Sequence, residues 1–320
     1  MVIGKFLVDI ENTSASKENV VRQSVFSRLA FFMHRHVQKK HTIEVVHGPL
    51  LKLKNRRKVE MGMGDYEAFK KKVFQLTKID LSCYKERQMR RRIDSLINKA
   101  KIKSYDEYVE ALRTNKELLE EFVAYLTINV SEFYRNPEQW RLLESNIFPY
   151  LFEKFGKNIK IWSAACSTGD EPYTLAMVLG KFVPLKNIQI VATDIDKQVL
   201  EKAQLGIYDD KSLKGLPADL KNKYFTKLDA KRFQVSDEVK RCVKFSQHNL
   251  LKDPYPDRCD LIVCRNVMIY FTEEAKQDIY KKFNAALKKE GILFVGSTEQ
   301  IIAPANYNFS TMKSFFYKKD

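Results

Sequence analysis

The residues that could do chemistry begin in a short run of small side chains at positions 163–169. A strand-like segment, residues 159–162, precedes this run, and the acidic pair Asp170 and Glu171 follows it, just before Pro172. Small side chains let a backbone approach a ligand closely, and the single glycine can adopt a positive φ at little cost. Because proline suits the first turn of a helix, this order is typical of a nucleotide-type site in a doubly wound α/β sheet.

A second acidic position follows the next predicted strand, residues 187–193. Asp194 and Asp196 end this strand, roughly 20 residues beyond the first loop, where such folds hold ribose hydroxyls. The chain has neither a G-x-G-x-x-G motif nor a P-loop lysine, which disfavours a pyrophosphate ligand. A ligand with adenosine and no phosphate fits better, so S-adenosylmethionine is the expected cofactor. A βα turn without any ligand is the alternative interpretation of the first loop taken alone.

Polar residues also end further predicted strands in the second half of the chain. Residues 159–320 alternate strands and helices, which predicts a mostly parallel sheet with an antiparallel final strand near residues 315–317. A small antiparallel excursion is expected at about residues 224–245. Ligands bind open α/β sheets at the carboxyl ends of the strands. The residues predicted at those ends are Glu171, Asp194, Asn249, Arg265, Asn266 and Tyr270.

A helical domain with a linker is predicted for residues 63–135. Its helices are expected at residues 65–76, 82–100, 106–114 and 116–125. Arg87, Arg90 and Arg91 crowd the first half of the second helix. They form either a solvated helix face or a docking face for an acidic helix, because guanidinium groups pair well with carboxylates.

The linker, residues 126–140, mixes polar with apolar residues. Asn129, Ser131, Glu132, Arg135 and Asn136 are its polar members. They are solvated if the linker is an ordinary loop, and they become ligand contacts if it lies over the cleft.

Composition limits the class of protein and its partners. The chain has 320 residues and a net charge of +16, which favours anionic partners, although many bacterial proteins are simply basic. No apolar run reaches the roughly 18 residues that a membrane span needs. The five cysteines include no Cys-x-x-Cys pair, so we expect no metal site, and we expect a reducing cytoplasm. Residues 1–62 are predicted to be a basic, loosely ordered extension with one helix near residues 20–38; a misassigned start is an alternative origin for them.

Six motifs, in this order, closely resemble the CheR family of chemotaxis receptor methyltransferases over about residues 65–320. The motifs are Asn129–Arg135, Trp162–Tyr173, Ala192–Asp196, His248–Leu251, Cys264–Phe271 and Gly296–Glu299. The resemblance implies an α/β, Rossmann-like S-adenosylmethionine-dependent methyltransferase domain, residues 136–320, with a small β-subdomain, preceded by an all-helical N-terminal domain. It also implies methylation of glutamate side chains on methyl-accepting chemotaxis receptors, with S-adenosylhomocysteine as the second product.

The resemblance assigns roles to individual residues by motif position. The implied cofactor contacts are Asn129, Ser131, Arg135, Glu171, Asp194, Asn249, Leu250, Arg265 and Asn266. Tyr270 would lie near the transferred methyl group; a core tyrosine is the alternative. Arg87, Arg90 and Arg91 would meet the acidic methylation helices of the receptor. No general base is needed, because a glutamate with a pKa of about 4.3 is already anionic at neutral pH.

Partners and competing functions complete the expectations. The receptor cytoplasmic domains are the expected partner, and we expect a cytoplasmic monomer recruited to receptor arrays, without membrane insertion or nucleic acid. Some members of the family bind a receptor's C-terminal pentapeptide through the β-subdomain. The short, glycine-free loop at residues 224–233 predicts no such dependence here. Two alternatives remain: a nucleic-acid methyltransferase, which Cys264-Arg-Asn-Val disfavours because it lacks the Pro-Pro of base methyltransferases, and a non-catalytic cofactor-binding scaffold.

Overall fold

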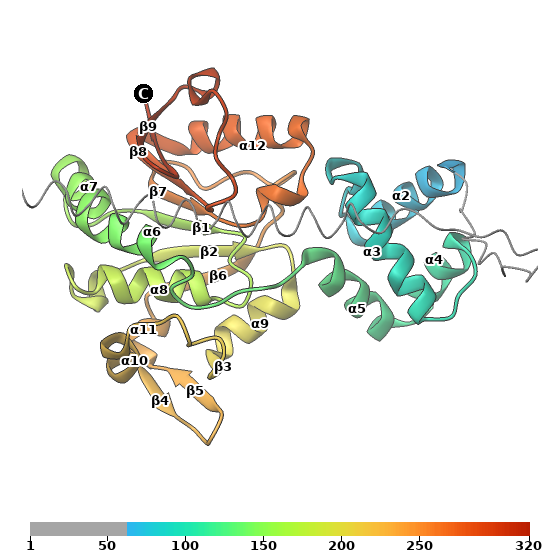
Figure 1. The fold of residues 1–320 in the computed structure, drawn as a ribbon, viewed down its shortest axis with the longest axis horizontal. Coiled ribbons are helices and arrows are strands. Elements are labelled where there is room, and N and C mark those ends of the chain that lie inside the picture. Colours follow the sequence, from blue (N-terminus) through green and yellow to red (C-terminus); the bar gives the residue numbers. More distant parts are fainter. Residues whose placement is uncertain (1–62) are drawn as a thin grey trace, which may run out of the picture. The chain divides into compact units, whose positions relative to one another are not determined.

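The computed structural model describes residues 63–320, which belong to one compact unit, Glu60–Asp320 (Figure 1). The predicted extension, residues 1–62, and the helix expected near residues 20–38 lie outside the described residues.

The first part of the described chain is helical, as predicted. Its helices are α2 (Met63–Thr77), α3 (Glu86–Lys99), α4 (Tyr105–Thr114) and α5 (Lys116–Thr127), with a 3₁₀ turn at Leu81–Cys83. Ser104 and Asn115 cap the last two helices by accepting backbone N–H groups, which marks where each begins. A separate apolar cluster that includes Phe69, Ile93 and Phe122 forms the core of this part.

Helix α3 begins at Glu86, later than predicted, because residues 83–85 pair with another segment of the chain. Tyr84 forms an isolated antiparallel bridge with Phe271, and their ring centroids lie 5.0 Å apart. The N–H of Lys85 donates to the carbonyl of Tyr270 at 2.9 Å, and the N–H of Thr272 donates to the carbonyl of Cys83 at 2.9 Å. This backbone pairing fixes the start of α3 against residues 270–272 of the second part.

The second part is a seven-stranded sheet with helices on both faces. Its strands are β1 (Ile161–Ala164), β2 (Ile190–Asp194), β6 (Val243–Gln247), β7 (Cys259–Cys264), β8 (Leu287–Val295), β9 (Phe309–Lys313) and β10 (Phe316–Lys319), in the order β6-β2-β1-β7-β8-β10-β9. Its helices are α6 (Pro137–Leu142), α7 (Phe148–Phe155), α8 (Asp170–Leu179), α9 (Lys197–Leu205), α11 (Asp237–Lys240) and α12 (Glu273–Ala286), and Leu143–Ile147 is π-helical. Figure 1 shows α12 on one face of the sheet and α8 on the other.

The centre of the sheet is parallel and fully buried. Strand β1 pairs in parallel with β2 and β7, and every residue of β1 and β7 is buried. Strands covered on both faces are near-continuous apolar runs, as these are. The predicted antiparallel final strand is confirmed in β10, which pairs with β8. Strand β9, a second antiparallel strand beside β10, was not predicted.

The predicted bounds of the β-subdomain, about residues 224–245, are wrong at both ends. The small sheet consists of β3 (Ile207–Asp209), β5 (Arg232–Val235) and β4 (Phe225–Lys227), which pair antiparallel in that order; α10 (Ala218–Tyr224) lies between β3 and β4 in the sequence. Residues 243–247 form β6, which pairs in parallel with β2 at the edge of the main sheet. A half-exposed edge strand has the same alternating pattern as a hairpin strand, so the sequence alone could not separate the two.

We predict that Gly169→Ala destabilises the fold more than Gly206→Ala does. Both glycines have a left-handed backbone, with φ values of 89° and 67°. An added Cβ at Gly169 would lie 2.9 Å from the Cβ of Ala203, whereas the nearest atom at Gly206 is Cδ of the long Lys240 side chain, at 3.3 Å. We expect a loss of about 1–2 kcal/mol from backbone strain at either site, and a further 1–3 kcal/mol from overpacking at Gly169 alone.

Denaturant unfolding of the two variants measures this difference, because the Gly206 variant reports the left-handed backbone strain without the clash against Ala203. Equal losses of unfolding free energy in the two variants would contradict the close packing of the β1–α8 loop.

Candidate active site

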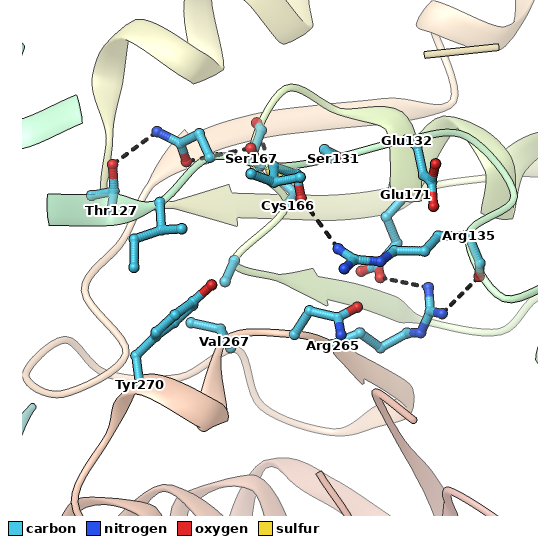
Figure 2. A pocket seen from close by; sticks show the side chains of 15 residues that line it. Thr127, Ser131, Glu132, Arg135, Cys166, Ser167, Glu171, Arg265, Val267 and Tyr270 are labelled. Carbon is cyan, nitrogen blue, oxygen red and sulfur yellow. Dashed lines mark hydrogen bonds and ion pairs between the residues drawn. The ribbon is translucent and has the colours of Figure 1, made fainter. Parts of the chain in front are cut away.

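A cleft opens where the central parallel strands end (Figure 2). Its first part is lined by residues 127–132, Arg135, residues 165–167, Glu171, residues 265–267 and Tyr270. Its second part is lined by Tyr84, Leu126, Asp194, Ile195, residues 248–251 and Phe271. The two parts share Thr127, Ala165, Val267 and Tyr270. The cleft is therefore continuous, and both the helical part and the sheet contribute to its walls.

The loop after β1 is held by the end of β2. The N–H of Cys166 donates to the carbonyl of Thr193 at 2.9 Å, and the N–H of Ser167 donates to Asp194 Oδ2 at 2.8 Å. Ala165 and Ser167 have φ values of 61° and 48°, a left-handed conformation that side-chain-bearing residues adopt at a cost of about 1–2 kcal/mol. These contacts offset the strain and keep the loop in a fixed shape beside the cleft.

Asp194 is buried with both carboxylate oxygens engaged. Its Oδ1 accepts the N–H of Asp196 at 3.0 Å, and its Oδ2 accepts the N–H of Ser167. Burial raises the pKa of Asp194 to about 6, and the backbone hydrogen bonds counteract only part of that effect. The N–H of Ile195 also stabilises the charged form. Because a carboxylate has about four acceptor positions, Asp194 keeps acceptor capacity for a donor such as a ribose hydroxyl.

The side-chain amide of Asn129 forms hydrogen bonds to other residues of the protein. Its Nδ2 donates to Asp196 Oδ2 and to Thr127 Oγ1, both at 2.8 Å, and its Oδ1 accepts from Ser167 Oγ at 3.3 Å. Asp196 is itself buried and caps α9 through the N–H of Gln198. The side chain of Asn129 thus fastens the linker to the loops after β1 and β2, and it lines the cleft at the same time.

Arg265 and Glu171 form a buried ion pair at the end of β7. Arg265 Nη1 lies 3.3 Å from Glu171 Oε2, and the arginine side chain is 2% exposed. Its Nη2 donates to the carbonyl of Arg135 and to Gln139 Oε1, both at 2.8 Å. Burial raises the pKa of Glu171, while the charge of Arg265 acts in the opposite direction. Glu171 Oε1 accepts from Ser163 Oγ at 2.9 Å, which fixes the carboxylate.

Arg135 is the cation with donors available to a ligand in the first part of the cleft. Figure 2 shows its guanidinium inside the cleft near Glu171 and Cys166. Its Nη1 donates to the carbonyl of Val130 at 3.2 Å, and within residues 66–320 it has no carboxylate partner. A planar guanidinium fork binds a carboxylate in bidentate fashion. Arg135 is therefore suited to the carboxylate of an amino-acid ligand.

Tyr270 points its hydroxyl into the cleft (Figure 2). It lies in a 3₁₀ turn, Met268–Tyr270, and its hydroxyl has no hydrogen-bond partner in the described part of the chain. Burial raises the pKa of Tyr270, and the positive charges of Arg92 and Arg135 partly counteract this effect. The phenol is therefore neutral at physiological pH and can donate a hydrogen bond or present its ring to a cation.

The arginines of α3 differ in their surroundings. Arg87 and Arg91 are exposed, and within residues 66–320 neither forms an ion pair. Arg90 is half-buried, with its guanidinium 5.2 Å from the ring centroid of Tyr66. Arg92 donates to the carbonyl of Tyr125 and stacks over its ring at 4.2 Å. Arg87 and Arg91 thus match the predicted solvent-facing position, whereas Arg90 packs against its own domain.

The predicted cofactor residues all line the cleft. Asn129, Ser131, Arg135, Glu171, Arg265 and Asn266 line its first part, Asp194, Asn249 and Leu250 line its second part, and Tyr270 lines both. Arg87, Arg90 and Arg91 do not line it. The positive charge of Arg92 lowers the pKa of Tyr270, but its position among several arginines of the sequence carries no separate signal for a role in the site.

The polar and aromatic groups of the cleft fit an adenosine-containing amino acid. Asp194 offers acceptor capacity to a ribose hydroxyl, Arg135 offers its guanidinium to an α-carboxylate, and the Tyr270 ring can face a sulfonium.

Within the described residues, no group of three or more His, Cys, Asp or Glu side chains is arranged to hold a metal ion. Among the helices of residues 63–320, none combines the length and the apolar character that a membrane crossing requires.

Comparisons with known proteins agree with this geometry. The family model "CheR methyltransferase, all-alpha domain" matches residues 64–127, and "CheR methyltransferase, SAM binding domain" matches residues 129–317. A chemotaxis protein methyltransferase of Listeria monocytogenes is 40% identical over 80% of this chain and 97% of its own length. One from Borreliella burgdorferi is 37% identical over 76% of this chain and 89% of its own length. The chain belongs to the CheR family of S-adenosylmethionine-dependent methyltransferases.

Proposed function

We propose that this protein methylates glutamate side chains on the cytoplasmic domains of methyl-accepting chemotaxis receptors. The observation that carries the proposal is the position of Tyr270, whose hydroxyl points into the part of the cleft that both pockets share. Its backbone also pairs with Lys85, at the start of the arginine-rich helix α3. One short segment thus connects the cofactor site with a basic surface suited to an acidic helix.

In this reaction the main task of the protein is to position the cofactor and the substrate carboxylate. When bound, S-adenosylmethionine would supply the methyl group: a substrate carboxylate oxygen would form the new C–O bond, and the electron pair of the C–S bond would stay on sulfur. The substrate glutamate is already ionised at neutral pH, so no residue must remove a proton. Arg135 would hold the cofactor carboxylate, and the Tyr270 hydroxyl would orient the substrate carboxylate. Correct alignment of the reacting atoms can supply several kcal/mol of the rate enhancement.

The basic face of α3 would select the substrate by charge. Arg87 and Arg91 are exposed on this helix and are available to carboxylates of a receptor helix. Arg92 lies deeper, and its charge reaches Tyr270, so it would attract the glutamate that enters the cleft. Attraction between surfaces of opposite charge speeds association and favours one orientation.

The remaining proposals concern the setting of the reaction. We propose that the protein acts as a cytoplasmic monomer and that receptor binding brings it to membrane arrays. The loop between β4 and β5 is four residues long, Leu228–Lys231, and supports the proposed independence from a receptor pentapeptide. Calorimetric titration with such a peptide tests the last proposal, and tight binding would refute it.

The first prediction tests the substrate. Membranes containing the host's chemoreceptors, incubated with the protein and radiolabelled S-adenosylmethionine, should acquire label on receptor protein that mild alkali releases, because a carboxyl methyl ester is base-labile. Added nucleic acid serves as the control and should stay unlabelled. Alkali-stable label on nucleic acid would support a nucleic-acid methyltransferase. Cofactor binding without any transfer would support a non-catalytic scaffold.

A second prediction concerns Tyr270. We expect Tyr270→Phe to lower kcat for receptor methylation by about 10- to 100-fold, the range expected for losing one hydrogen bond to a charged group. The KM for S-adenosylmethionine should change little, because the ring stays in place. Tyr307→Phe is the matched control: this tyrosine packs on Tyr280, away from the cleft, and its variant should retain full kcat. An unchanged kcat for Tyr270→Phe would remove the hydroxyl from the mechanism.

A third prediction concerns the pH dependence of cofactor binding. Asp194 has a pKa raised to about 6, so its carboxylate gains a proton as the pH falls through 6 and loses acceptor positions. The affinity for S-adenosylhomocysteine should therefore be about tenfold lower at pH 5 than at pH 7, since one pKa unit corresponds to a factor of ten. Asp194→Asn should bind weakly, with an affinity that is flat over this range. Calorimetry at several pH values measures both proteins, and the same slope in the variant would assign the titration to another group.

A further inference from the structure

The Gly296–Glu299 motif has no part in the cleft described above, although it follows strand β8 directly. Glu299 is 5% exposed and does not line the cleft. Its Oε2 accepts the N–H groups of Asn266 at 2.6 Å and Gly296 at 2.9 Å. Its Oε1 accepts the N–H groups of Met268 at 2.7 Å and Ile269 at 3.3 Å. One carboxylate thus binds three backbone amides of the segment that leads from Arg265 to Tyr270.

No cation neutralises this carboxylate within residues 66–320. Its charge is instead stabilised by successive backbone N–H groups that converge on it, an arrangement that favours anions. Hydrogen bonds to an ionised acceptor are about twice as strong as neutral ones. The segment and the carboxylate therefore depend on each other: the amides lack another partner, and the charge lacks another source of stabilisation.

Gly296 provides the space for this contact. A Cβ at this position would lie 2.5 Å from Glu299 Oε2 and 2.9 Å from the N of Asn266. Its φ lies outside the positive range, so the requirement for glycine is steric and does not come from backbone conformation. Any side chain at position 296 would push the carboxylate away from the amides that it binds.

The bound segment carries residues of the cofactor site at both ends. Asn266 lines the first part of the cleft and has a left-handed φ of 61°, which costs energy unless neighbouring contacts hold it. Tyr270 lines both parts. Between them, Met268 is buried and its N–H is one of the four that Glu299 accepts.

We propose that Glu299 is a positioning residue: its carboxylate holds residues 266–269 in the conformation that places Asn266 and Tyr270 in the cleft, and Gly296 keeps the space that it needs. Glu299 touches neither cofactor nor substrate in this arrangement, and it acts through the backbone. The predicted effect of Glu299 on cofactor binding requires only that the cofactor is the one bound by the family. The predicted effect on turnover also requires the proposed function.

The first experiment measures cofactor binding. Glu299→Gln has the same shape, but its amide nitrogen turns a donor toward two backbone donors. We expect the Kd for S-adenosylhomocysteine, measured by calorimetry on the full chain, to rise by about tenfold, the effect of losing one charge-assisted hydrogen bond. Glu274→Gln makes the same change on the exposed face of α12 and should leave the Kd unchanged.

The second experiment separates positioning from stability. Thermal unfolding is recorded for each variant, and binding is measured well below the transition. A Glu299→Gln protein that unfolds earlier but binds S-adenosylhomocysteine with the original Kd, and methylates with the original kcat per folded molecule, would overturn the proposal. The proposal is supported if Glu299→Gln raises the Kd for S-adenosylhomocysteine and the KM for S-adenosylmethionine but leaves the KM for the receptor unchanged.

The third experiment uses Gly296→Ala, which displaces the Glu299 carboxylate without removing it. This variant also tests the proposal if Glu299→Gln does not fold. Its Kd should rise to a similar degree, and the double variant should be no weaker than the worse single variant, because both changes break one contact. Additive effects would show that the two residues act separately and would contradict the proposal. Because binding of S-adenosylhomocysteine needs no receptor, failure of receptor methylation alone would count against the proposed function and leave this test intact.

Discussion

The buried guanidinium of Arg265 connects the parts of the cleft. It bonds to Glu171 at the start of α8, to the carbonyl of Arg135 in the linker and to Gln139 in α6, while its own backbone ends β7. Removing one partner of such a buried pair costs about 3–5 kcal/mol, because it leaves the other charge unpaired. That is a large share of the 5–15 kcal/mol by which a typical domain is stable. The shape of the cofactor site and the stability of the fold therefore depend on the same contact.

Carboxylates near this site are stabilised in two ways. Glu171 has a cation, Arg265, whereas Asp194 and Glu299 rely on backbone N–H groups. Backbone amides cannot move without moving the loop that carries them, so each carboxylate also fixes a loop. Contacts within the protein thus hold the shape of the cleft, which lowers the cost of ordering it on binding.

The helical part is joined to the cleft by two sets of hydrogen bonds. Residues 83–85 pair with residues 270–272 through the backbone, and Thr127 at the end of α5 donates to Asp196 at 3.1 Å. Both connections end at residues beside the cofactor site. The basic face of α3 is therefore placed by the same backbone contacts that place Tyr270.

The sequence by itself determined the helical and α/β parts, the parallel pairing of the central strands, and many of the residues that line the cleft. Parallel strands end at one edge, so the polar residues after them, such as Glu171 and Asp194, had to meet there. Only the tertiary structure decided how these residues are used. The side chain of Asn129 fastens the linker, Arg90 packs on Tyr66, and Glu299 binds the amides of a distant loop. Such contacts join residues far apart in the chain, and neither periodicity nor motif spacing specifies which donor a buried acceptor will meet. Strand β6 shows the same limit, because an alternating pattern defines a half-exposed strand but not the sheet that it joins.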